Sequence, residues 1–170
     1  MSRIRTATPG SARVAAFDLG SDAGWAVLDR EGRRVDSGTE DVRAKRQEGP
    51  GMRPLRFRAV VSRVLDEHRP AMAAYELVRR HLGTDAAHIY GELRGVLREE
   101  LERRGIPYTA REVSEMKKAA TGKGNAKTAE MVAAARARWG HPLPVEGKPE
   151  AGDDEADALF TALVAMKELP

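Results

Sequence analysis

Two short apolar runs and one alternating segment follow one another within the first 42 residues, with no segment of helical periodicity between them. They cover Arg13–Gly20, Gly24–Asp29 and Arg34–Val42, and Gly32 lies in the turn that joins the last two. Strands joined by turns this short pair as antiparallel neighbours, because a parallel connection needs a crossover of about a dozen residues or more. The sequence therefore predicts an antiparallel three-stranded meander at the start of the fold.

Beyond the loop at Lys45–Pro54, the pattern changes to an alternation of helices and strands. Helical spacing of apolar residues begins at Leu55, and Gly105 provides a stop for a second, longer helix. The expected elements are a helix over 55–68, a strand over 71–78, a helix over 85–104, a strand over 106–113, a basic glycine-containing segment over 116–127, a helix over 128–139 and a final helix over 153–169. Strands separated by helices pair in parallel through right-handed crossovers.

This order of elements predicts an α/β fold with one five-stranded mixed sheet. The antiparallel meander forms one part of the sheet, the parallel strands form the other, and helices flank it on both faces. That arrangement is the ribonuclease H-like architecture. The length of 170 residues and the 41% hydrophobic content suit a single core. We expect residues 1–10 to form a flexible basic arm and residues 11–170 to form one domain.

The composition narrows the class of protein further. The chain contains no cysteine, so disulfides and thiolate chemistry are excluded. No apolar run approaches the roughly 20 residues that a membrane helix needs, and the first twelve residues lack the apolar middle of a secretory signal. These features predict a cytoplasmic protein with no membrane partner. The net charge of +3 and the pI of about 9.4 permit binding to a polyanion.

Carboxylates stand at three places where the surrounding sequence is otherwise apolar. Asp18 follows the first apolar run, and Glu76 interrupts the run "AAYELV". Asp154 and Asp157 lie three residues apart at the start of the last helix, so both point along one side of it. Each place also has a purely structural explanation. Asp18 could cap a turn, and Glu76 could pair with a nearby arginine. Acidic residues in the first turn of a helix are stabilised by the helix dipole, which would account for Asp154 and Asp157.

Together, these carboxylates predict a metal site. In the fold expected above, the first strand, the fourth strand and the start of the last helix meet at one end of the sheet. An ionised carboxylate is costly to bury without a cationic partner, and several of them repel one another. Oxygen ligands of this kind suit Mg²⁺ or Mn²⁺, and two such ions can promote hydrolysis of a phosphodiester.

The motifs that contain these residues resemble those of the RuvC-type Holliday-junction resolvases, within the ribonuclease H-like nucleases. The matching segments are "FDLGSDAGWAV", "YELV", "ATGKGNAKTAEMV" and "DDEADAL", which together span residues 14 to about 164. The sequences of these motifs are most similar to those of phage or prophage members. The resemblance implies a nuclease domain over residues 11–170 that acts in a bacterial or phage-infected cell.

The resemblance also implies a metal-binding set, which holds two ions of Mg²⁺ or Mn²⁺. Asp153 is an extra neighbour that can substitute for Asp154. Lys117 stands where the family places a lysine that assists catalysis or binds phosphate. The implied ligands are Asp18, Glu76, Asp154 and Asp157.

Basic residues near these motifs are candidates for DNA contact. Arg79 stands where cellular family members carry an aromatic residue that stacks on a junction base, and this favours phosphate contact or arginine stacking instead. Lys127 is our choice for a second basic position after the Gly-x-Gly turn. Solvation of a loop is the alternative explanation for the lysines. The candidate DNA-binding residues are Arg79, Arg80, Lys118, Lys123 and Lys127.

The function implied by the resemblance is metal-dependent nicking of four-way junctions, extending to other branched DNA. A homodimer is expected because a junction has two symmetric strands to cut, and Tyr90 is a candidate for the dimer interface. Two alternatives remain open at this point: a non-catalytic module that binds branched DNA, and a ribonuclease H-like nuclease that acts on RNA–DNA hybrids.

Overall fold

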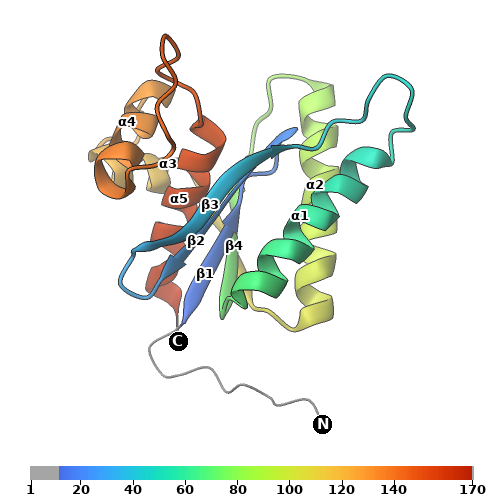
Figure 1. The fold of residues 1–170 in the computed structure, drawn as a ribbon, viewed down its shortest axis with the longest axis horizontal. Coiled ribbons are helices and arrows are strands. Elements are labelled where there is room, and N and C mark those ends of the chain that lie inside the picture. The colour runs from blue at the N-terminus through green and yellow to red at the C-terminus, as the bar shows by residue number, and fades with distance from the viewer. Residues whose placement is uncertain (1–11, 170) are drawn as a thin grey trace.

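A five-stranded mixed sheet separates two layers of helices in residues 12–169, which are the residues that this computed structural model describes (Figure 1). The strand order across the sheet is β3-β2-β1-β4-β5. β1 pairs antiparallel with β2 and parallel with β4, so the meander and the parallel half are joined at β1. The strands are β1 (Arg13–Phe17), β2 (Asp22–Asp29), β3 (Arg34–Asp41), β4 (Met72–Leu77) and β5 (Tyr108–Glu112).

Each face of the sheet is covered by its own group of helices (Figure 1). α1 (Met52–His68) and α2 (Thr84–Arg104) cover one face. The other face is covered by α3 (Val113–Thr121), α4 (Thr128–Trp139) and α5 (Asp153–Ala165), and a short 3₁₀ helix, η1 (Met166–Glu168), follows α5. The predicted fold class and mixed sheet are thus confirmed. The basic arm predicted for residues 1–10 lies outside the described residues.

Alternation along the strands divides the core into two apolar layers. On β1, Ala15 and Phe17 pack with α1 and α2, whereas Val14 and Ala16 pack with the helices of the other face. All four side chains are fully buried, as expected for a strand covered on both faces. Among the described residues, no helix is long and apolar enough to cross a bilayer.

The helix α3 includes the first part of the basic glycine-containing segment predicted over 116–127. It begins at Val113 because Glu112 caps it and the side chain of Glu115 accepts a hydrogen bond from the backbone N–H of Glu112. It ends at Gly122, whose φ of 78° is a left-handed conformation that glycine adopts readily. The sequence did not indicate the full length of this helix, because the alanines and lysines over 116–121 give only a weak apolar period.

Candidate active site

Four carboxylates meet at the carboxyl-terminal ends of β1 and β4. Asp18 directly follows β1, and Glu76 lies near the end of β4. Phe17 pairs with Tyr75 across these parallel strands, which places Asp18 and Glu76 at neighbouring positions. The first turn of α5 packs over β2 and β4 and supplies Asp154 and Asp157. The structure therefore brings together all four residues that the sequence singled out.

Asp18 lies at the centre of this cluster. Burial raises its pKa well above the usual range, and a hydrogen bond with Asp154 and the charges of Glu76 and Asp157 raise it further. Burial also raises the pKa of Asp154, whereas the hydrogen bond from Asp18 lowers it. In the absence of a cation, these surroundings favour the protonated form of Asp18, whose hydroxyl donates a hydrogen bond to the carboxylate of Asp154.

Asp157 and Glu76 also have raised pKa values. Burial raises the pKa of Asp157 to about 8, and the charges of Glu76, Asp153 and Asp154 contribute to the rise. Burial likewise raises the pKa of Glu76, and the charge of Asp154 adds to it. A site that holds several carboxyl groups at raised pKa values is one that a bound cation would stabilise in its ionised form.

Lys117 is the cation that the fold brings to this cluster. It lies on α3 and is partly buried. Its positive charge lowers the pKa of both Glu76 and Asp157, against the larger effect of burial. The predicted lysine is therefore placed beside two of the four predicted ligands.

The donor set of the cluster fits a hard divalent cation, because it consists of carboxylate oxygens alone. Of the two adjacent aspartates, Asp154 forms a hydrogen bond with Asp18, whereas Asp153 acts on Asp154 and Asp157 only through its charge. Within residues 12–169, no three such side chains converge closely enough to form a complete metal-binding group.

Gly24 fixes the distance between β2 and the first turn of α5. A Cβ atom at this position would lie 2.1 Å from the carbonyl oxygen of Asp154 and 2.3 Å from its carbonyl carbon. The carbonyl of Gly24 also accepts a hydrogen bond of 2.8 Å from the backbone N–H of Asp18. One glycine thus touches the backbone of two carboxylate residues. Sequence reasoning missed it, although a glycine inside an apolar strand often marks a close approach.

Tyr90 of α2 braces the end of β4. Its hydroxyl donates a hydrogen bond of 2.9 Å to the carbonyl of Glu76 and accepts one of 3.3 Å from the N–H of Val78. The side chain packs inside the protomer, with only 6% of the residue exposed. Tyr90 is our candidate for the dimer interface, and within this chain its hydroxyl group is already used by contacts between α2 and the end of β4. No pattern in the sequence signals this role.

The candidate DNA-binding residues lie around the cluster on exposed segments. Arg79 and Arg80 follow β4, and the Nε of Arg79 donates a 2.9 Å hydrogen bond to the carboxylate of Glu112. Lys118 lies on α3, Lys123 lies in the turn after it, and Lys127 is the N-cap of α4. All five residues are exposed. Arg79 is thus already paired in this structure, whereas the lysines extend from a surface next to Lys117.

Comparison of the sequence with known proteins identifies relatives along most of its length. Residues 14–165 match the sequence profile described as crossover junction endodeoxyribonuclease RuvC. The RuvC protein of Delftia acidovorans is 30% identical over 156 residues, which cover 89% of this chain and 82% of the relative. The RuvC protein of Anaeromyxobacter dehalogenans is 32% identical over 158 residues, which cover 88% and 78% respectively.

Solved structures agree with the sequence relatives. Thermus thermophilus RuvC, in a structure described as a complex with Holliday junction substrate, superimposes with a TM-score of 0.74 at 26% identity. That match covers 92% of this chain and 96% of the Thermus chain. The yeast mitochondrial Holliday junction resolvase Ydc2 shares the fold, with a TM-score of 0.57 at 15% identity, covering 92% and 81% respectively. The chain therefore belongs to the RuvC family of crossover junction endodeoxyribonucleases.

Proposed function

We propose that this protein is a divalent-metal-dependent endodeoxyribonuclease that nicks four-way DNA junctions and other branched DNA. The observation that carries the proposal is the convergence of Asp18, Glu76, Asp154 and Asp157 beside Lys117. Family membership supports the reaction, because the family consists of crossover junction endodeoxyribonucleases. The similarity to phage members, which the motif sequences suggested, stays a prediction.

The four carboxylates would hold the divalent cations, Mg²⁺ or Mn²⁺, and we propose two ions per site. When bound, such ions activate water and stabilise the charge on the leaving oxygen of a phosphodiester. Asp18 would be the central ligand, since Glu76, Asp154 and Asp157 all act on its carboxyl group. Asp154 and Asp157 enter the site from one helical turn, so a small movement of α5 adjusts both.

Lys117 has a separate role that needs no metal. Its positive charge acts on the carboxyl groups of both Glu76 and Asp157. A fixed positive charge there would hold the scissile phosphate and stabilise the additional negative charge of the transition state. Lys118, Lys123 and Lys127 would contact backbone phosphates on either side, and so would Arg79 and Arg80. DNA binding of this kind weakens steeply with salt.

The substrate is tested by offering DNA of different shapes under one condition. Labelled four-way, three-way and linear DNA and an RNA–DNA hybrid are incubated with the protein and Mg²⁺ or Mn²⁺. We expect paired nicks at symmetric positions of the four-way junction and little cutting of linear duplex. Cutting of the plain hybrid would establish the ribonuclease H-like alternative, and binding of junctions without any cutting would establish the non-catalytic module.

We also propose that the active form is a homodimer, because two-fold symmetric cutting of a junction matches a two-fold symmetric protein. Sedimentation of the protein alone and with one equivalent of junction measures this directly. Two chains per junction are expected, and a single chain per junction would contradict the proposal.

Gly24→Ala should disable the site without removing any ligand. The added methyl group collides with the backbone of Asp154, so the first turn of α5 must move away from β2 and from Asp18. Misplacement by about 1 Å lowers the rate of a catalysed reaction by roughly 100-fold, and we expect a loss of that size in single-turnover cleavage. Overpacking should also cost about 1–3 kcal/mol of unfolding free energy.

Gly20→Ala is the matched control for that variant. Gly20 lies four residues earlier, in the β1–β2 connection. A Cβ atom added there would lie 3.7 Å from its nearest neighbour, the carbonyl oxygen of Asp22. We expect it to keep cleavage within about threefold of wild type, since 3.7 Å is an ordinary van der Waals distance. Equal losses in the two variants would show that the close approach at Gly24 does not position the site.

Tyr90→Phe should loosen the end of β4 while leaving the ring in place. It removes the hydrogen bonds to the carbonyl of Glu76 and from the N–H of Val78. Leaving part-buried backbone groups unpaired costs about 1–3 kcal/mol. We expect unfolding free energy to fall by that amount in denaturant titrations, together with a cleavage loss of about tenfold. Unchanged stability would mean that water replaces the phenol at no cost.

A further inference from the structure

A single arginine of α4 holds both ends of the connection between α4 and α5. The connection comprises residues 140–152 and leads directly into the turn that carries Asp154 and Asp157. Figure 1 shows it, in orange, extending beyond the start of α5. Because the backbone is continuous, the path of this connection decides where the first turn of α5 lies.

The arginine is Arg136, in the last turn of α4. Its Nε donates a 2.9 Å hydrogen bond to the carbonyl of Pro142. Its Nη2 donates to two further carbonyls, at 3.4 Å to that of Leu143 and at 3.1 Å to that of Ala151. Pro142 and Leu143 lie near the first end of the connection and Ala151 lies near its last end. One planar guanidinium, whose donors have a fixed geometry, therefore joins the two ends.

Gly152 carries this restraint into α5. It is the N-cap of the helix, and its φ of 85° is a left-handed conformation that glycine adopts readily. Its carbonyl accepts a 2.9 Å hydrogen bond from the N–H of Ala156. A Cβ atom at Gly152 would lie only 2.3 Å from the Cβ of Pro142. The proline that Arg136 holds is thus packed directly against the residue that starts α5.

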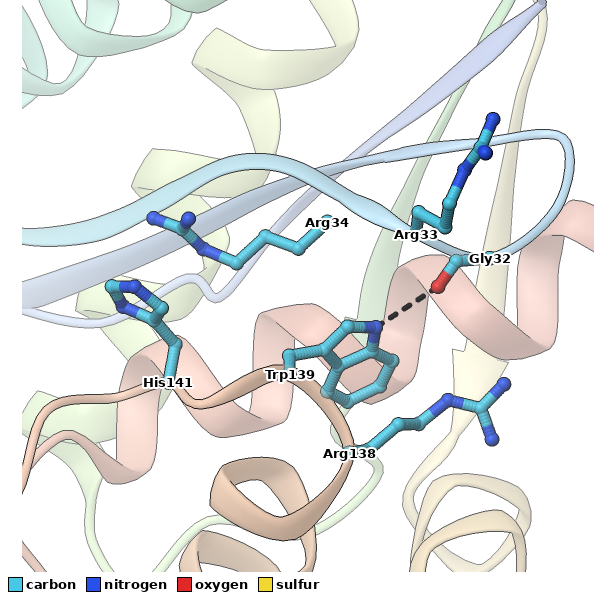
Figure 2. A pocket seen from close by; sticks show the side chains of 6 residues that line it. All are labelled: Gly32, Arg33, Arg34, Arg138, Trp139 and His141. Atoms are coloured by element: carbon cyan, nitrogen blue, oxygen red, sulfur yellow. Dashed lines mark hydrogen bonds between the residues drawn. The ribbon is translucent and has the colours of Figure 1, made fainter.

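The end of α4 from which the arginine extends is itself fixed (Figure 2). The Nε1 of Trp139 donates a 2.9 Å hydrogen bond to the carbonyl of Gly32, in the turn between β2 and β3. The ring of Trp139 meets Phe160 of α5 edge-on, with centroids 5.0 Å apart. Beyond it, the Nδ1 of His141 lies 3.4 Å from the carboxylate of Glu155, in the first turn of α5. Arg136 therefore holds the connection from a helix end that the sheet and α5 keep in place.

We propose that Arg136 is a positioning residue for the metal site. By joining Pro142 to Ala151, it fixes the direction in which α5 starts, and thereby the places of the carboxyl groups of Asp154 and Asp157. Metal ligands need this kind of support, because productive geometry requires them to be held within about 0.5 Å. The inference rests on the proposed function, because it assumes that these two carboxylates hold the metal.

The core contacts of α4 do not depend on the guanidinium. Val132 and Ala135 are fully buried and belong to the apolar layer that α4 shares with α5. Arg136 adds hydrogen bonds to the connection alone, and no carboxylate pairs with it within residues 12–169. We therefore expect a variant at this position to fold, with the change confined to the connection and the first turn of α5.

The test compares Arg136→Gln with wild type in Mn²⁺ binding without DNA, followed by the electron paramagnetic resonance signal of the free ion. Loss of a group that orients metal ligands lowers metal affinity about 10–100-fold, and we expect a loss of about tenfold here. Hydrogen exchange should rise in a peptide covering residues 150–158, where the N–H groups of Asp153 and Ala156 bond to backbone carbonyls. Exchange in β1 and β4 should stay unchanged.

The direction of the change separates positioning from charge. Arg136→Gln removes a positive charge, and a cation should bind more tightly when a like charge is removed. Weaker binding would therefore identify the hydrogen bonds as the cause. Arg136→Lys keeps the charge but loses the planar fork, so its Mn²⁺ affinity should lie between those of wild type and Arg136→Gln.

Two variants serve as matched controls. Arg138→Gln makes the same change on the same helix, and Figure 2 shows Arg138 extending away from His141 of the connection. Leu143→Ser alters a residue that is 65% exposed but keeps the carbonyl that Arg136 contacts. Both should bind Mn²⁺ within about twofold of wild type, as exposed side chains away from such contacts have small effects.

Thermal unfolding checks that each protein is folded at the assay temperature, and Arg136→Lys carries the test if Arg136→Gln is not. Wild-type Mn²⁺ affinity in the folded variant would overturn the inference. So would an equal loss in Arg138→Gln or in Leu143→Ser, because neither removes the hydrogen bonds of Arg136. A wild-type protein that binds no Mn²⁺ would instead overturn the proposed metal site itself.

Discussion

Asp18→Asn should abolish junction cleavage and leave junction binding intact. Asp18 is the one carboxylate whose pKa responds to all three of the others, so it is the common neighbour in the cluster. The amide keeps the size of the side chain but removes an anionic ligand, and we expect the single-turnover rate to fall by at least about 1,000-fold. Junction affinity should stay within about threefold, because the exposed basic residues that bind phosphate are unchanged. Gel-shift and cleavage assays on the same labelled junction measure both.

Asp22→Asn provides the matched control for that experiment. The charge of Asp22 also acts on Asp154, but its own carboxylate is partly exposed and pairs with Arg43 at 2.7 Å. Cleavage by this variant should remain within about threefold of wild type, since surface ion pairs contribute little. If Asp18→Asn cuts as fast as Asp22→Asn, the assignment of the carboxylate cluster is wrong.

Asp157→Asn should stabilise the metal-free protein at alkaline pH while it destroys activity. Burial first, and then the charges of Glu76, Asp153 and Asp154, raise the pKa of Asp157 to about 8, against a lowering effect of Lys117. The unfolded value is about 4. Between those two values the folded state binds more protons than the unfolded state, so stability falls as pH rises.

The size of this effect follows from the linkage between protonation and folding. A pKa raised by several units corresponds to several kcal/mol at most, and water entry or proton sharing reduces it. We expect Asp157→Asn to be about 1–3 kcal/mol more stable than wild type at pH 8 in EDTA and nearly equal to it at pH 4. Thermal unfolding at the two pH values should show a shift of several degrees at pH 8 only.

Asp153→Asn is the control that distinguishes loss of a proposed metal ligand from loss of a nearby negative charge. It removes one negative neighbour of Asp157 but leaves the carboxyl group of Asp157 in place. Its stabilisation at pH 8 should therefore be smaller, and part of its cleavage activity should remain. A loss of stability at pH 8 in Asp157→Asn would mean that this carboxylate already has a favourable partner in the metal-free protein.

The fold was predictable because strand and helix patterns in this chain are unambiguous in the segments that matter. β1 and β2 are apolar on both faces, and the turn at Gly32 leaves only antiparallel pairing. The crossover helices then require β4 and β5 to be parallel to β1. The carboxylates were predictable for a related reason: each interrupts an apolar run or crowds the start of a buried helix, where an unneutralised charge is costly.

What the sequence did not reveal depends on contacts between distant segments. The approach of Gly24 to Asp154 joins positions 130 residues apart, and the bond from Tyr90 to Glu76 depends on how α2 lies over β4. The pairing of Arg79 with Glu112 likewise requires β4 and β5 to be neighbours.

Titration of the protein with Mn²⁺ at pH 8, followed by the electron paramagnetic resonance signal of the free ion, tests the metal site most directly. Wild-type protein and Asp18→Asn are compared at equal concentration without DNA. If the carboxylates form a cation site, the wild-type chain binds at least one Mn²⁺ ion and the variant binds at least tenfold more weakly. Equal binding by the two proteins would show that Asp18, Glu76, Asp154 and Asp157 do not hold the metal.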